Sequence, residues 1–355
     1  MAKRSKKQEK RKKKMRTLIL LLFLTIIMLG TSTYAWFTAN KVVTINALNV
    51  QVQTAGGIQI STNAKDWKSV ITNTDITTGY SYNSGAIASV NQLPRDVTAV
   101  SSNCVYNTTG AEQGRINMFS SVITNNASTG KYDITTVKET DANGTSGKYI
   151  AFDVFLRLDS QSTVYMTPES NVTVVGAEDR GLKNAARVAF IQLGQGLSST
   201  AAETIAGWNN PSSIKVWEPN YDAHSQIVIN SVAPEYGVTL TQTTQGVYDP
   251  VSYAGVSSET GPQDLIATVK ANPIQTGTQT VGVNFRTKAT NTDYVTFYEN
   301  MPAGVTKYRI YMWVEGQDID CENNATGSEI SYKVVLSTTN NPAEVNGGGA
   351  SSSNG

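Results

Sequence analysis

The stretch that decides the fold is Ile150-Ala151-Phe152-Asp153-Val154-Phe155-Leu156-Arg157-Leu158. Apolar side chains stand at every second position from Ile150 to Leu158, and Asp153 and Arg157 are among the residues between them. A period of two residues is that of a β-strand and places the alternating apolar residues on one face. We therefore predict a strand with one face buried and the other mostly in contact with water.

The same alternation returns twice near the end of the chain. Apolar residues take every second position from Tyr308 to Val314 and again from Ile330 to Leu336, and a polar stretch over residues 315–329 separates the two runs. We predict two neighbouring antiparallel strands joined by that connection. Shorter strand candidates lie at residues 58–60, 164–166, 172–175, 188–193, 227–229, 265–269 and 281–285.

Turn-forming residues separate these runs, in clusters of Gly, Asn, Ser and Thr such as residues 125–130 and 141–147. Helical periodicity is rare, and we expect one short helix at residues 201–206. The pattern predicts an all-β fold, a jelly-roll-like antiparallel β-sandwich with long decorated loops. We assign it to residues 47–339, with insertions, and expect the Gly-, Ser- and Asn-rich residues 340–355 to form a flexible tail.

The first 35 residues have the order of a secretory signal peptide helix. Residues 1–16 hold ten Lys or Arg against one Glu, residues 17–30 are an uncharged apolar core, and residues 31–35 end in small residues suited to signal peptidase. We expect cleavage after Ala35 and a secreted chain, in the extracellular matrix or at the cell surface. The alternative is an uncleaved helix over residues 17–37 that anchors the chain in the membrane, with the remainder on the same outer side.

The charge balance changes once this leader is removed. The totals of 29 basic and 28 acidic residues lose ten and one, which leaves 19 and 27, a net charge of −8 from Trp36 onward. An acidic chain is poorly suited to bind nucleic acid through bulk charge, so we expect no nucleic-acid partner.

Catalytic motifs are missing from the sequence. His224 is the single histidine, which excludes multi-histidine metal sites, and no Gly-x-Ser-x-Gly, Gly-x-x-x-x-Gly-Lys or His-Glu-x-x-His pattern occurs. We therefore expect a protein that is not an enzyme and that holds no organic cofactor.

One acidic segment has the spacing of a cation site. Asp318, Asp320 and Glu322 offer carboxylates at alternate positions, the oxygen ligands that calcium requires, although the turn glycine of an EF-hand is missing. The alternative is an acidic hairpin loop that faces water. Cys104 and Cys321 are the only cysteines, and an exported chain could either join them in one disulfide or leave them unpaired.

Two segments carry a resemblance to a known family. Residues 32–38, Ser-Thr-Tyr-Ala-Trp-Phe-Thr, and residues 42–52 after them resemble the TasA and camelysin family of exported Gram-positive proteins. The segments 150–158 and 313–321 are similar to surface proteins of related bacteria. The resemblance implies a jelly roll and extracellular fibres of the biofilm matrix, in which one subunit's N-terminal segment completes the sheet of the next. This chain is longer than typical fibre-forming members, and we expect insertions within residues 194–262.

The segment over residues 36–46 is the candidate donor strand. It is β-prone, nearly uncharged and, after cleavage, at a free end, so an exposed sheet edge on another copy could pair with it. The residues assigned to assembly are Trp36, Phe37, Val42, Val43 and Ile45. The alternative is that the segment folds back as the first strand of its own domain.

A second function remains open, that of a monomeric adhesin or carbohydrate-binding jelly roll. In it, Trp67, Trp208 or Trp217 would stack on sugar rings of a surface or matrix polysaccharide, although core packing is the commoner role of a tryptophan. Filaments seen by electron microscopy would favour the fibre subunit over the adhesin.

Overall fold

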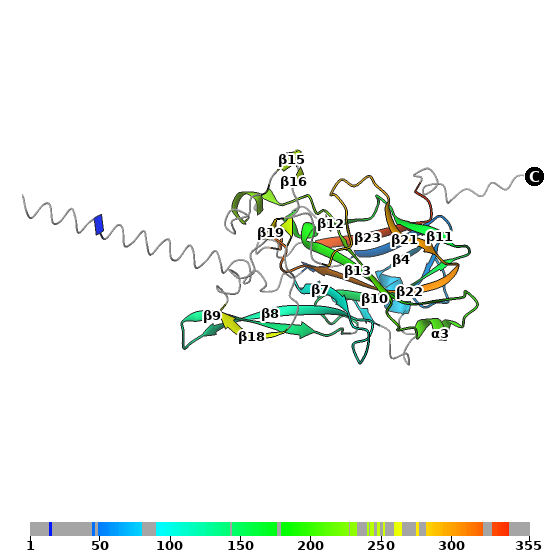
Figure 1. The fold of residues 1–355 in the computed structure, drawn as a ribbon, viewed down its shortest axis with the longest axis horizontal. Coiled ribbons are helices and arrows are strands. Elements are labelled where there is room, and N and C mark those ends of the chain that lie inside the picture. The colour runs from blue at the N-terminus through cyan, green and yellow to red at the C-terminus, as the bar shows by residue number, and fades with distance from the viewer. Residues whose placement is uncertain are drawn as a thin grey trace, which may run out of the picture.

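The computed structural model describes residues 14–15, 45–46, 49–79, 90–142, 144–175, 179–226, 228–232, 240, 242–244, 247–248, 251–252, 259–264, 275–276, 282–321 and 329–340. In this part of the chain two β-sheets pack face to face, and a third sheet projects from them as an arm (Figure 1). The prediction of an all-β sandwich is confirmed. None of the described helices has the length and apolarity needed to cross a membrane.

One sheet of the sandwich, which we name the long sheet, has the strand order β20-β14-β13-β22-β10-β3, with β5 also beside β10. Its central pair, β10 and β22, is antiparallel and runs in register from Ile150 opposite Met312 to Leu158 opposite Gly304. The predicted strand over residues 150–158 is therefore confirmed at both ends. Its members are β3 (Gln59–Ser61), β5 (Asn91–Gln92), β10 (Ile150–Leu158), β13 (Ala186–Gly196), β14 (Ser213–Glu218), β20 (Phe285–Arg286) and β22 (Gly304–Val314).

The second sheet, which we name the facing sheet, has the order β21-β11-β23-β2-β4, with β12 also beside β23. Its first and last strands along the chain, β2 and β23, are parallel neighbours, with Asn49 opposite Ser331 and Ala55 opposite Ser337. Its members are β2 (Asn49–Ala55), β4 (Val70–Thr72), β11 (Ser162–Met166), β12 (Asn171–Val175), β21 (Val295–Met301) and β23 (Glu329–Ser337).

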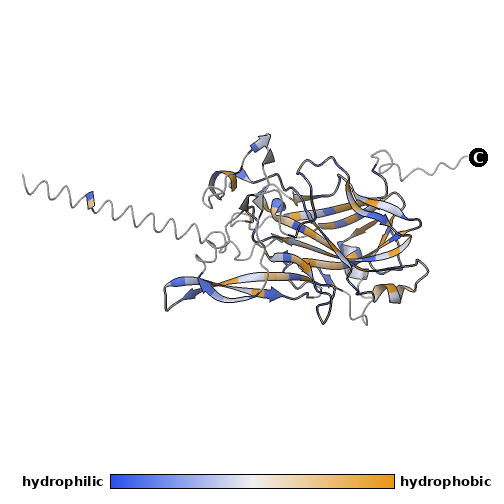
Figure 2. Cartoon of the chain, in the orientation of Figure 1, coloured by the Kyte–Doolittle hydropathy of each residue, from blue (hydrophilic) through white to orange (hydrophobic). Residues whose placement is uncertain are grey.

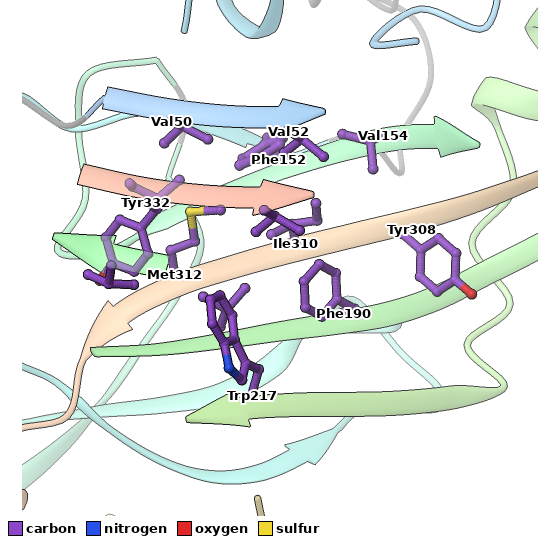
Figure 3. Packing of buried hydrophobic residues seen from close by; sticks show 14 of the residues in the cluster. Val50, Val52, Phe152, Val154, Phe190, Trp217, Tyr308, Ile310, Met312 and Tyr332 are labelled. Atoms are coloured by element: carbon purple, nitrogen blue, oxygen red, sulfur yellow. The ribbon is translucent and has the colours of Figure 1, made fainter. Parts of the chain in front are cut away.

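The core lies between these two sheets. Phe152, Val154 and Ile310 of the long sheet point toward Val52 and Tyr332 of the facing sheet (Figure 3). Hydrophobic residues gather on the strands of the sandwich (Figure 2). Burying a large apolar side chain contributes about 1.5–3 kcal/mol, so this alternation supplies the main stabilising term of the fold.

Two of the sequence expectations about these strands are wrong. β22 and β23 are not neighbours in one sheet, because both edges of β22 are already paired with β10 and β13, so the connection after Val314 crosses to the facing sheet. The second face of β10 is not wet either, because every residue of the strand except Arg157 is buried. That face lies beneath a further layer of structure.

The third sheet, which we name the arm sheet, supplies part of that layer. It has the order β18-β9-β8-β7, and the β8–β9 hairpin extends beyond the sandwich (Figure 1). Its members are β7 (Ser101–Tyr106), β8 (Ile116–Asn126), β9 (Lys131–Glu139) and β18 (Thr260–Asp264). A second apolar cluster packs between the long sheet and the base of the arm, and includes Met118, Tyr311 and Trp313.

The remaining elements are short. Three two-stranded pairs occur in the described residues: β1 (Ile45–Asn46) with β6 (Asp96–Val97), β15 (Gln242–Thr244) with β16 (Val247–Tyr248), and β17 (Val251–Ser252) with β19 (Gln275–Thr276). The helices are α2 (Asn73–Gly79), α3 (Ala202–Ala206), the 3-10 turn η2 (Leu182–Ala185) and the π-type turn η3 (Val228–Val232).

The shorter predicted elements have mixed outcomes. The expected helix at 201–206 matches α3, and the strand candidates at 58–60, 164–166, 172–175 and 188–193 match β3, β11, β12 and β13. The candidate at 227–229 is wrong, since η3 begins at Val228. The candidate at 265–269 lies outside the described residues, as do nearly all of the leader and of the C-terminal tail.

Candidate functional site

The acidic segment after β22 is buried rather than exposed to water. Residues 315–321, which we name the arch, leave the long sheet at Val314, and Asp318 and Asp320 are 7% and 1% exposed. Backbone bonds hold the arch in place: the Glu315 N–H donates to the Ala185 carbonyl at 2.8 Å, and the Gly316 N–H donates to the Val100 carbonyl at 2.9 Å. The expectation of a solvated hairpin loop is therefore wrong.

Two of the three described carboxylates of the arch, those of Asp318 and Asp320, face a cation of the same chain. Arg187 Nη2 lies 2.6 Å from Asp318 Oδ2 and 2.8 Å from Glu218 Oε1. His224 Nδ1 lies 2.7 Å from Asp320 Oδ2, and the Ser225 N–H donates to Asp320 Oδ1 at 3.1 Å. Buried charges are tolerated only when they are paired in this way. These contacts fasten the arch to β13, to β14 and to the loop that follows β14.

The surroundings of this cluster shift the pKa values of its members. Burial opposes the charged form of His224, but the carboxylate of Asp320, and beyond it those of Asp318 and Asp222, outweigh burial and raise the pKa of His224. Burial raises the pKa of Glu315, although hydrogen bonds from Ser101 and Trp313 oppose the effect. The cluster therefore favours a protonated His224.

Two of the three candidate calcium ligands lie in the arch. These are Asp318 and Asp320, whereas Glu322 lies outside the described residues. Within the described part of the chain, no group of three acidic, His or Cys side chains is placed to hold a metal ion. A calcium ion would compete with Arg187 for Asp318 and with His224 for Asp320, and binding there stays a prediction.

The two cysteines lie in different apolar clusters. Cys321 packs in the core between the two sheets, whereas Cys104 packs in the cluster between the long sheet and the arm. The structure does not join them in a disulfide. Burial, followed by the charge of Glu315, raises the pKa of the Cys104 thiol to about 12, so little reactive thiolate forms. The disulfide stays a prediction that the mass of the intact chain can test.

A second charged cluster lies on the face of the long sheet beneath the arm. Asp153 accepts two bonds from Arg309, at 2.7 and 3.1 Å, and its Oδ2 lies 3.1 Å from Lys307 Nζ. Burial alone would raise the pKa of Asp153, but Arg309 and Lys307 outweigh it and hold that pKa below its ordinary value. Lys307 Nζ also donates to the carbonyls of Ala206 and Trp208, at 2.7 and 2.9 Å.

Sequence reasoning missed the partners in both clusters. Arg187 stands in the otherwise apolar run from Ala185 to Ile191, and Lys307 and Arg309 stand between the apolar residues of β22. A charge inside a strand that is buried on both faces needs a partner, and this is the signal that could have found them. The sequence could not show which carboxylate each of these cations pairs with, because partners such as Arg187 and Asp318 are distant in sequence.

A polar hollow of about 440 Å³ lies beside β4 and α2. Its polar groups mostly bind one another: Asn63 Nδ2 donates to Asp66 Oδ2 at 2.7 Å, Thr62 Oγ1 donates to the Asp75 carbonyl at 3.0 Å, and Lys68 pairs with Asp75. The Thr72 N–H also donates to Asp75 Oδ2, which caps the start of α2. Local hydrogen bonds, one ion pair and the cap of α2 therefore explain why these polar groups are present.

The three tryptophans named as candidate sugar platforms have different environments. Trp217 is fully buried, and its indole N–H donates to Thr287 Oγ1 at 2.9 Å. Trp67 and Trp208 are half-buried and pack on a small cluster around Phe155, with the Arg157 guanidinium 4.4 Å from the Trp67 ring centre. Core packing accounts for Trp217, and one guanidinium already covers Trp67.

The residues assigned to assembly are only partly described. Trp36, Phe37, Val42 and Val43 lie outside the described residues. Ile45 and Asn46 form β1 and pair with Val97 and Asp96 of the same chain. No family model matches the chain, and no curated protein or solved structure matches it.

Proposed function

We propose that this chain is a secreted structural subunit of an extracellular fibre of the biofilm matrix, assembled when its N-terminal segment inserts into the sheet of the next subunit. The position of β2 is the observation that carries the proposal. β2 already pairs with β23 on one side and β4 on the other, so the place in the facing sheet next to β23 is filled from residue 49 onward. The position beside β23 therefore does not require residues 36–44 of the same chain, which leaves them available to pair with another subunit.

The clusters of charged side chains support a structural role. The arch cluster and the Asp153 cluster are enclosed, and the carboxylates of Asp153, Glu218, Asp318 and Asp320 face cations of the same chain. Such clusters hold loops and sheets in fixed positions rather than meeting a substrate. The sequence pattern of the leader supports export, and its basic block sets the direction of insertion.

The test is a deletion in material exported by a Gram-positive host. We expect N-terminal sequencing of the secreted chain to begin at Trp36, and electron microscopy to show filaments. Deletion of Trp36 to Val42 should leave a folded, soluble monomer that forms none. The matched control removes residues 341–355 instead and should still give filaments. Filaments from the N-terminal deletion would overturn the donor-segment proposal, as would a deletion that cannot fold.

A monomeric adhesin is the second candidate, and the hollow beside β4 is the observation that favours it. The hollow is open and lined by hydroxyl, amide and carboxylate groups, the chemistry that binds sugar hydroxyls. Binding of matrix polysaccharide by a chain that stays monomeric, and loss of that binding on Asp66→Ala, would favour this function over the fibre subunit.

A further inference from the structure

The edges of the two sandwich sheets differ in how much backbone they leave open. β5 and β20 have two residues each, β3 and β4 have three each, and β12, which pairs only with β23 in the described part of the chain, has five. β21 has seven residues, and within the described part of the chain it pairs only with β11. It contains no Pro, Lys or Arg, residues that often blunt an exposed edge. By contrast, β18 at the edge of the arm sheet contains Pro262.

On the side of β21, the facing sheet also ends before the long sheet does. Phe297 of β21 packs against Phe190 of β13, with ring centres 5.0 Å apart, and against Tyr308 of β22 at 5.7 Å. β21 therefore lies over β13 and β22, whereas the long sheet continues past β13 to β14 and β20. The start of β14 forms a ledge with no described strand of the facing sheet above it.

Burial along β14 agrees with such a ledge. On the face of β14 that carries Lys215, Ser213 and Lys215 are only half-buried, whereas Trp217 is fully buried in the core between the two sheets. Lys215 is directly opposite Phe190 in the register, so it lies on the same face, beside the position of Phe297. One more strand beside β21 would cover this part of the ledge.

We propose that the edge of β21 is the acceptor, and that residues 36–44 of a second copy of this chain form the missing strand above β14. This inference rests on the proposed fibre function and names its binding surface. Nine residues suffice to pair along a seven-residue edge. The segment carries two positive charges after cleavage, the Lys41 side chain and the α-amino group of Trp36, and the edge carries the opposite charge, Glu299. Because successive side chains of a strand point to opposite faces, one of the two aromatic residues Trp36 and Phe37 supplies apolar area to cover the alkyl stem of Lys215.

Cysteine cross-linking in exported full-length chain tests the surface. Single cysteines at Thr38, Ala39 or Asn40 are each combined with Thr296→Cys on β21, and the matched control uses Gln263→Cys on the exposed edge strand β18. We expect oxidation of the Thr296 set to give a ladder of covalent multimers in at least one pairing, and the Gln263 set to give none. Slower amide hydrogen exchange over residues 295–301 in filaments than in the N-terminal deletion gives a second readout that needs no cysteine.

The possible failures are distinguishable. Filaments that form without a Thr296 ladder and without protection of residues 295–301 would overturn the β21 assignment and leave the fibre function standing. A cross-link within one chain would show that the segment folds back on its own sheet, which overturns donation itself. If the processed chain stays monomeric at all concentrations, both the fibre function and the acceptor assignment are wrong.

Discussion

On one face of β10, Phe152 and Val154 pack among apolar side chains of the facing sheet, whereas on the other face Asp153 lies between Arg309 and Lys307 beneath the arm. Arg309 also donates to the Gly114 carbonyl at 3.2 Å, and Gly114 belongs to the connection between β7 and β8 of the arm sheet. Both faces exclude water, but apolar contact holds one and hydrogen-bonded charge holds the other. A polar residue in a strand therefore marks a buried partner as readily as it marks solvent.

Truncation on the apolar face should have the largest effect. Phe152→Ala removes a ring that is 1% exposed, and we expect the free energy of unfolding to fall by about 3–5 kcal/mol. Chemical denaturation of the purified chain measures the loss. A fall below about 1 kcal/mol would mean that the two sheets do not pack through this residue.

The charged face should be nearly as sensitive. Asp153→Asn leaves Arg309 and Lys307 without a compensating carboxylate, and we expect a loss of about 3 kcal/mol, since Asn still accepts one hydrogen bond. Asp159→Asn, at an exposed bend just after β10, is the matched control and should change stability by less than about 0.5 kcal/mol. If both variants changed the free energy of unfolding by the same small amount, the second face of β10 would be in contact with water after all.

The arch extends the comparison to a histidine whose pKa is raised by neighbouring carboxylates. Because the folded-state pKa of His224 lies above its ordinary value of 6.5, the His224–Asp320 contact contributes its full stability below about pH 6.5 and loses it as the pH rises through the raised pKa. His224→Gln should cost about 1.5–3 kcal/mol at low pH and less at high pH. The melting temperatures of the wild-type protein and of the His224→Gln variant, measured at pH values below and above 6.5, provide the test. A difference in melting temperature that does not change with pH would contradict the prediction.

The arm hairpin should be the least sensitive region. Val122 is 48% exposed and lies on β8, and the β8–β9 hairpin extends beyond the sandwich (Figure 1). Val122→Thr keeps the β-branched shape, and we expect stability to change by less than about 0.5 kcal/mol. Val154→Thr is the matched control on β10, where the buried hydroxyl should cost more. A large loss from Val122→Thr would show that another surface covers the arm.

Sequence patterns predicted the strands well and their neighbours poorly. The alternation in residues 150–158 and 308–314 identifies β10 and β22, because a period of two residues is a local property. The pairing of strands depends on which edges are already occupied, so β22 and β23, which are close in sequence, lie in different sheets. The prediction of a wet face at Asp153 failed for a related reason, because the layer that covers this face includes residues remote in sequence, such as Gly114, which accepts a hydrogen bond from Arg309.

The spacing of acidic residues singled out the arch, but it did not predict that the arch is buried and paired with cations. Spacing shows that Asp318 and Asp320 lie two residues apart, and it cannot show that Arg187 and His224 reach them from distant strands and loops. Cation and carboxylate were both visible in the sequence, and only the fold brings them together.

The parallel pairing of β2 with β23 has a consequence for the time course of folding. Asn49 and Ser331 are opposite one another although most of the chain lies between them, so the facing sheet cannot close until the last strand is available. Contacts of such long sequence separation make folding slow. If the chain is exported from its N-terminus onward, as the proposed function requires, β2 has one unpaired edge until β23 has also crossed the membrane. During that interval the β-rich chain is at its most vulnerable to mispairing with its neighbours.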